Sequence, residues 1–209
     1  MSDKTIENSR AIFRADIRDH VMTVLHDDGL YRHLRCARPD TGCYTFDIVT
    51  WPGHLSIGGA YSEGYVFART ADMFEFFAGD GDGINPGYWA EKIVTNGPSR
   101  EFSPERFKAA VVEEFMRRRH LYPGESAEIF QAVRSFVLDE DYAELGETAR
   151  SAVERFEYRT ASDKTFDFVD WWEWDITDWS PHFLRVCHAI VWGIAEYRRI
   201  KAEAVNAGV

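Results

Sequence analysis

Residues 43–59 have the sequence CYTFDIVTWPGHLSIGG. Two runs rich in Val, Ile, Tyr and Phe flank the Pro52-Gly53 pair, and short runs of this kind around turn residues are typical of a β-hairpin. Similar runs lie on both sides along the chain, namely VMTVLHD, LYRHLRCA and GYVFA, separated by turn residues at 28–29, 39–42 and 62–64. We therefore expect an antiparallel meander of four or five strands across about residues 21–68.

The segments outside this meander have helical periodicity. The first, about residues 6–18, carries apolar side chains among charges at near-helical spacing. Thr70 is expected to cap the first helix after the meander, with Asp72 in its first turn. Ser-Pro pairs at 103–104 and 180–181 predict two helix starts, because serine caps a helix and proline suits its first position. Helices are expected at 6–18, 70–79, 103–119, 125–138, 142–158 and 180–204.

Strands followed by helices, rather than alternating with them, predict an α+β fold in which helices cover one face of an antiparallel sheet. A chain of 209 residues is long enough to bury one core without disulfide or metal support. We expect a single domain over residues 1–209, with the N-terminal helix and sheet in about 1–68 and a mainly helical portion in about 70–205.

Composition disfavours several classes of protein. Lys and Arg number 24 against 35 Asp and Glu, which gives a net charge of −11, whereas proteins that neutralise nucleic-acid phosphates carry a basic surplus. The polar start MSDKTIENSR and the lack of a long apolar run predict neither a signal peptide nor a membrane span. The three cysteines, Cys36, Cys43 and Cys187, have no metal-ligand spacing and suit a reducing cytoplasm.

Five blocks of the chain carry a resemblance to a known group of proteins: HDDGLYRHLR (26–35), FDIVTWPGHLSI (46–57), DMFEFF (72–77), INPGYWAEK (84–92) and HFLRVCHAIVWGIAEY (182–197). Together they resemble a family of uncharacterised proteins encoded by tailed bacteriophages and prophages. The resemblance implies expression in the cytoplasm of an infected bacterium and an accessory role. It implies no catalytic residue, because no activity is associated with that family.

Titratable residues concentrate in the strand-rich region. Side chains of this type, brought together by adjacent strands, can bind a divalent metal or perform acid/base chemistry. No two of them form a recognised ligand pair, and Asp28-Gly29 is also typical of a hairpin turn, so no metal or cofactor is predicted. The candidates for a pocket between sheet and helices are His26, His33, Arg35, Asp47 and His54.

Asp80, Asp82 and Glu91 have the spacing of the first, third and last ligands of a helix-loop-helix calcium site. Position five is Ile84, which has no side-chain oxygen, and position six is Asn85 where the sharp turn of such a loop needs glycine. The GDGDG sequence at residues 79–83 is therefore expected to be a solvated, flexible loop between two helical pieces.

Residues 166–179, FDFVDWWEWDITDW, combine four tryptophans with acids. In an extended chain, alternation would place Trp172 and Trp174 on a buried side and leave Trp171 and Trp179 as surface anchors. Six acids against Lys164 alone give residues 163–178 a charge of six minus one, or −5. Such a strip could bind a host protein, and the alternative is that the tryptophans fill the core while the acids form its solvated edge. The candidate surface comprises Asp167, Asp170, Trp171, Glu173, Asp175, Asp178 and Trp179.

Two classes of function follow. The first is a non-enzymatic accessory protein that inhibits or redirects a host protein, such as a defence component, through the acidic and aromatic surface. The second is a small enzyme or ligand-binding protein that uses the His, Asp and Arg residues of the strands. No nucleophile elbow or nucleotide-binding loop supports catalysis, so the sequence favours the first class. A minor virion or assembly component is a third possibility and rests on the resemblance alone.

Overall fold

The computed structural model describes residues 2–59, 62–78, 83–139 and 143–208. Contacts divide the chain into two compact units: unit 1 comprises Met1–Ser99 and Trp179–Val209, and unit 2 comprises Arg100–Asp178. Each unit has its own cluster of buried apolar side chains. Unit 2 is inserted between the two segments of unit 1, and its helices bury their apolar faces against one another.

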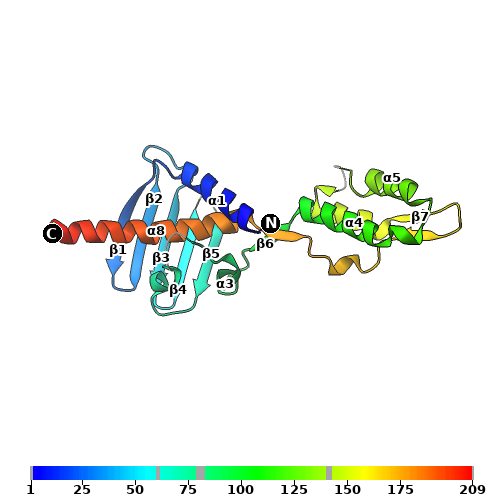
Figure 1. Ribbon diagram of the computed structural model, residues 1–209. Coiled ribbons are helices and arrows are strands. Elements are labelled where there is room, and N and C mark those ends of the chain that lie inside the picture. The colour runs from blue at the N-terminus through cyan, green and yellow to red at the C-terminus, as the bar shows by residue number, and fades with distance from the viewer. Residues whose placement is uncertain (1, 60–61, 79–82, 140–142, 209) are drawn as a thin grey trace. The chain divides into compact units, whose positions relative to one another are not determined.

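Unit 1 contains the expected meander (Figure 1). Each strand pairs antiparallel with the next in the order of the sequence. The Pro52-Gly53 turn joins the third and fourth strands, and Gly53 has a φ of 82°, a conformation that glycine adopts without steric cost. The α+β class is confirmed. The strands are β1 Val21–Asp28, β2 Tyr31–Ala37, β3 Phe46–Trp51, β4 His54–Gly59 and β5 Ser62–Ala68.

Helices pack on one face of this sheet. Figure 1 shows α8 (Pro181–Asn206) lying across the strands, with α1 (Ser2–Asp16) beside it. The strand residues that face α8 alternate with half-exposed residues, and Leu34, Ile48 and Leu55 are fully buried among them. The last helix begins after the Ser180-Pro181 pair, as the sequence predicts, and its first half is buried.

A glycine allows α8 to approach the sheet closely. A Cβ placed on Gly193 would lie 2.5 Å from Cδ1 of Ile48 on β3, much closer than carbon atoms pack. Both residues are buried, so a side chain added at Gly193 could not turn away from Ile48 into solvent. Gly193 therefore sets the distance between the helix and the sheet, at the expense of the higher helix propensity of alanine.

The contact at Gly193 can be tested by a double-mutant cycle with Gly193→Ala and Ile48→Val. The added Cβ overpacks the core in the wild-type background, whereas valine lacks the Cδ1 atom that it would meet. We expect the destabilisation by Gly193→Ala to be smaller by about 1 kcal/mol or more when Ile48 is already valine. Urea unfolding of the four proteins measures this coupling, and additive free energies would contradict the proposed contact.

The short helix α2 (Met73–Phe77) is capped differently from the expectation. The Asp72 side chain accepts a hydrogen bond from the Phe74 backbone N–H at 2.9 Å, so Asp72, rather than Thr70, is the N-cap. Thr70 donates its hydroxyl hydrogen to the Asp72 carbonyl at 3.0 Å. The two carboxylate oxygens of Asp72 also accept hydrogen bonds from Nη1 and Nη2 of Arg32, at 2.9 and 3.0 Å. These bonds connect the cap of α2 to strand β2. A second short helix, α3 (Pro86–Ala90), was not expected from the sequence.

Unit 2 is mainly helical. The helix starting at Ser103-Pro104 is confirmed, since the Ser103 hydroxyl accepts a hydrogen bond from the Arg106 N–H at 3.2 Å. The expected helices at 125–138 and 142–158 correspond to shorter ones, and residues 157–167 form a two-stranded hairpin. The elements are β6 Arg100–Phe102, α4 Pro104–Arg118, η1 Arg119–Leu121, α5 Ser126–Phe136, α7 Gly146–Arg155, β7 Glu157–Arg159, β8 Thr165–Asp167, η2 Trp171–Glu173 and β9 Thr177–Trp179.

The two ends of unit 1 meet where the chain leaves it and returns. The Ser180 N–H donates a hydrogen bond to the Ser99 carbonyl at 3.0 Å. Strand β6 pairs with β9 just beyond this point. A few residues are therefore enough to join the two ends of unit 1 without stretching the chain.

Replacement of residues 100–178 by a short Gly-Ser linker should leave unit 1 folded, because the linker spans only the Ser99–Ser180 hydrogen bond. The expected result is a monodisperse protein whose amide spectrum retains the resonances of β1 to β5. Loss of dispersed strand resonances would show that unit 1 needs unit 2 in order to fold.

Candidate functional site

The candidate residues of the strands share one face of the sheet, but it is not the face that α8 covers. Along β2 and β3 the alternation places His33, Arg35 and Asp47 opposite the buried positions. We call this second face, which also carries Trp51 and His54, the outer face. The expected pocket between sheet and helices is therefore wrong for these side chains, because strand alternation directs them away from the helices.

Three of the candidates form a hydrogen-bonded group around Asp47. Arg35 donates from Nε and Nη2 to the two carboxylate oxygens at 3.0 and 3.1 Å, and His33 donates from Nε2 to Oδ1 at 3.1 Å. Partial burial raises the pKa of Asp47, but the bonds from Arg35 and His33 outweigh it, and the pKa lies below its ordinary 3.8. Asp47 is thus an ionised acceptor that is already engaged by two neighbours.

The other two histidines have local roles. His26 lies opposite His33 in the register of β1 and β2, next to an irregularity after Val24. His54 stacks on Trp51 with ring centroids 5.0 Å apart and an angle of 9°, and its Nδ1 donates to the Pro52 carbonyl at 3.2 Å. The contacts of His54 are thus within its own turn.

The titratable groups of the outer face lie apart from the cavities that the described residues form. Cavities of about 90, 520 and 510 Å³ occur elsewhere in the fold and are lined by other residues. Within the described ranges, no three His, Cys, Asp or Glu side chains are grouped so that they could hold a metal ion. Asp80 and Asp82, considered above for calcium, lie outside the described residues.

The aromatic and acidic tract is not an extended strand. Asp170 adopts a left-handed conformation with a φ of 54°, and residues 171–173 form the 3₁₀ turn η2. Hydrogen bonds from the Glu173 N–H to the Asp170 carbonyl at 3.0 Å, and from the Trp174 N–H to the Trp171 carbonyl at 3.2 Å, close this turn. The turn changes the faces to which successive side chains point, so the alternation inferred from the sequence does not apply.

Three of the four tryptophans, Trp171, Trp172 and Trp179, consequently differ from the expectation, whereas Trp174 agrees with it. Trp172 is 66% exposed, whereas the sequence analysis placed it on the buried side. Trp171 and Trp174 are partly buried against the core of unit 2, and Trp174 meets Phe168 edge to face at 5.6 Å. Trp179 is partly buried against the core of unit 1. Trp172 is therefore the surface anchor of the tract, in place of Trp171 and Trp179.

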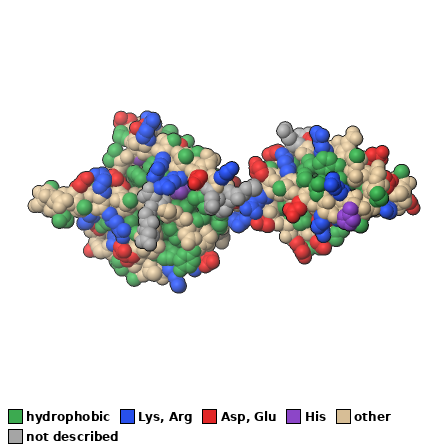
Figure 2. Space-filling model, in the orientation of Figure 1, with side chains coloured by type: hydrophobic (Ala, Val, Ile, Leu, Met, Phe, Trp, Pro, Cys, Tyr) green, Lys and Arg blue, Asp and Glu red, His purple; other side chains and the backbone are tan. Residues whose placement is uncertain are grey.

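Arginines from distant positions neutralise much of the acidic strip. Arg106 contacts Asp175 at 2.9 Å and Asp178 at 3.5 Å, and Arg100 contacts Asp175 at 3.4 Å. The Nη2 of Arg118 lies 3.4 Å from Oδ1 of Asp167. On the face shown in Figure 2, acidic and basic side chains are accordingly interspersed rather than separated. A charge of −5 counted along the tract overstates its field, because these partners lie outside it in the sequence.

Two carboxylates of the strip differ from the rest. Asp170 and Glu173 are exposed, and within the described residues neither side chain has an ion-pair partner within 4.0 Å. They flank Trp171 and Trp172 in η2, and Val169, which precedes them, is 45% exposed. We call Val169, Asp170, Trp172 and Glu173 the Trp172 surface.

His188, in the buried half of α8, is a packed histidine. Its Nε2 lies 3.0 Å from the Ser9 hydroxyl, and its ring stacks on Phe13 at 6.0 Å. The Ser9 hydroxyl donates its hydrogen to the Ile6 carbonyl at 2.8 Å, so it accepts from His188, which makes Nε2 the protonated nitrogen. Burial, together with the charges of two nearby arginines on α1, lowers the pKa of His188 to about 4.

The low pKa of His188 predicts a loss of stability in weak acid. Between pH 6.5 and pH 4 the unfolded state binds the proton and the folded state does not, so the stabilisation is complete above about pH 6.5 and decreases as the pH falls. We expect about 2 kcal/mol of the free energy of unfolding to be lost through this group between pH 7 and pH 5. Urea unfolding of the wild type and of His188→Gln at both pH values measures the contribution of His188. Equal losses of unfolding free energy in the two proteins would contradict the prediction.

No helix within the described ranges combines the length and apolar character needed to cross a membrane. Comparison of the chain with protein-family models, curated proteins and solved structures finds no match. A function therefore has to be argued from the side chains.

Proposed function

We propose that this protein is a non-enzymatic binding protein of a phage-infected bacterium, in which it inhibits or redirects a host protein in the cytoplasm. A component of host defence is one candidate for that protein. The resemblance of five sequence blocks to phage-encoded proteins supports a role in the phage-infected cell. The Trp172 surface supports the mode of action.

The exposure of Trp172 carries the proposal. This side chain is 66% exposed while its neighbours Trp171 and Trp174 pack on the core, so the fold holds the ring out on an anchored turn. Covering the exposed part of an indole would contribute about 3 kcal/mol to binding. Tryptophan is also the residue type most enriched among the side chains that dominate protein interfaces.

The two carboxylates beside the ring indicate the chemistry of the partner. Asp170 and Glu173 are exposed and have no ion pair in the described structure, so a basic group of a partner could approach without displacing an arginine. Asp167, Asp175 and Asp178 already have arginine partners and are less suited to this role. We therefore propose that the partner presents an apolar pocket bordered by Lys or Arg.

The ligand-binding or enzymatic alternative has weaker support. His33, Arg35 and Asp47 do contact one another on the outer face. Both oxygens of Asp47 are engaged, however, and none of the three lines one of the cavities described above. A catalytic base needs a free lone pair directed at a bound substrate.

Capture experiments with the tagged protein in phage-infected cell lysate test the proposal. The wild type should retain a specific host protein, and Trp172→Ala should lose most of it, while the stability of the fold changes by less than about 0.5 kcal/mol because the ring is exposed. The double variant Asp170→Lys/Glu173→Lys should also lose the host protein, through repulsion of its basic groups.

Glu154→Lys is a matched control, since Glu154 is an exposed acid on α7 away from the tract. It should retain the host protein at the level of the wild type. Equal capture by the wild type and Trp172→Ala, with both proteins folded, would remove the Trp172 surface from the mechanism. Capture of nothing by a folded wild-type bait would count against a host-protein binder altogether.

A further inference from the structure

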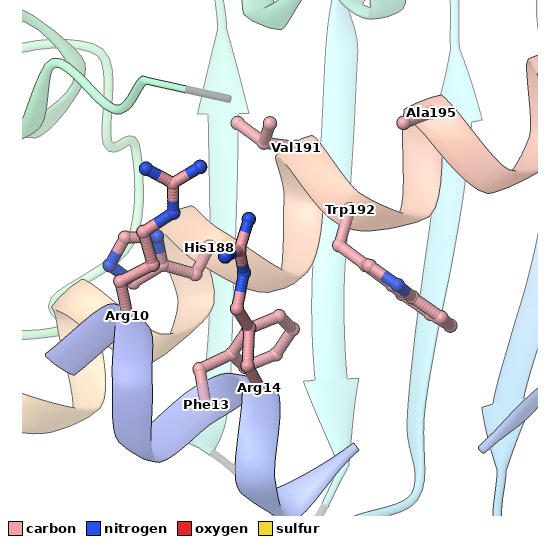
Figure 3. A pocket seen from close by; sticks show the side chains of 7 residues that line it. All are labelled: Arg10, Phe13, Arg14, His188, Val191, Trp192 and Ala195. Atoms are coloured by element: carbon pink, nitrogen blue, oxygen red, sulfur yellow. The ribbon is translucent and has the colours of Figure 1, made fainter. Parts of the chain in front are cut away.

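A small cavity in unit 1 lies between α1 and α8, remote in the fold from the outer face of the sheet. Its volume is about 90 Å³, enough for several water molecules. Its walls combine two arginines with mainly apolar side chains (Figure 3). The lining residues are Arg10, Phe13, Arg14, His188, Val191, Trp192 and Ala195.

The positive charge at this cavity comes from α1. Arg10 and Arg14 are four positions apart, so they lie on one side of the helix, and Figure 3 shows both projecting from it toward α8. His188 contributes no charge at neutral pH, because its Nε2–H is donated to Ser9 and its pKa is about 4. Arg10 and Arg14 each have a further interaction within the chain. A guanidinium has five N–H donors, so a single partner does not occupy all of them.

The remaining walls suit a hydrocarbon group. Phe13 is buried and packs on the His188 ring, while Val191 and Trp192 are half-buried on successive positions of α8. Ala195 lies at the exposed end and leaves the cavity open to solvent on that side. Apolar walls exclude water from the guanidiniums and so strengthen their attraction for an anion.

We infer that this cavity is a binding site for a small organic acid, whose carboxylate lies against Arg10 and Arg14 and whose short apolar body contacts Val191, Trp192 and Ala195. Arginine favours carboxylates because its planar fork of donors matches two oxygens at once. The volume excludes a nucleotide or a sugar phosphate from the enclosed part. The site is independent of the Trp172 surface, which lies in unit 2.

Titration of the full-length protein with sodium butyrate, followed by the indole N–H resonance of Trp192, tests this inference. The resonance is assigned by comparison with Trp192→Phe. Butyrate should shift it saturably, and inorganic phosphate and n-butanol, which lack the apolar body and the charge respectively, should each bind at least about 10-fold more weakly. Equal affinity for phosphate or for butanol would overturn the assignment to an organic acid.

Variants locate the site. Arg10→Gln/Arg14→Gln should weaken butyrate binding by about 10-fold or more, because charge-assisted hydrogen bonds are lost. Arg18→Gln, which removes one arginine charge at an exposed residue just beyond α1, should bind as the wild type does. Ala195→Leu leaves all charges in place and narrows the exposed end of the cavity, so it should also weaken binding.

The Ala195→Leu variant keeps the test decisive if the double arginine variant fails to fold, since Ala195 is exposed on a helix in which leucine is well tolerated. Unchanged butyrate affinity in folded Ala195→Leu, or in a folded double arginine variant, would overturn the site.

Discussion

The packing of α8 on the five-stranded sheet is the contact on which the structure of unit 1 depends. It covers the buried positions of β2 to β4, and the absence of a side chain at Gly193 lets it lie close to Ile48. The same helix supplies His188, Val191 and Trp192 to the cavity against α1. The sheet core and the cavity are therefore two consequences of where one helix lies.

The covered face of the sheet also explains why the candidate residues of the strands do not form an active site. Alternation assigns each strand position to one of two faces, and apolar positions take the face that α8 covers. His33, Arg35 and Asp47 necessarily take the other, where solvent reaches them and where they pair with one another. In unit 2, ion pairs weaken the acidic surface that the sequence predicts. Arg100, Arg106 and Arg118 neutralise acids of a strip that is distant from them in the sequence.

Local signals in the sequence predicted most of the fold and little of the candidate site. The meander followed from apolar runs between turn residues, and Ser103-Pro104 and Ser180-Pro181 marked two helix starts. Arg32, forty positions away, also binds the Asp72 cap, and this contact could not be read from neighbouring residues. The exposure of Trp172 depends on the left-handed Asp170, a conformation that a sequence pattern of alternating rings and acids does not contain. The division into two units was missed because both parts of the helical region carry similar apolar periodicity.

The insertion of unit 2 has a consequence for how the protein is made. Strand β5 ends at Ala68 and α8 begins at Pro181, so the ribosome completes the sheet long before the helix that covers it. At roughly 5–20 residues per second, the apolar face carrying Leu34, Ile48 and Leu55 waits on the order of 10 s for its partner. During that interval the nascent sheet exposes an apolar face of the kind that aggregates and that chaperones cover.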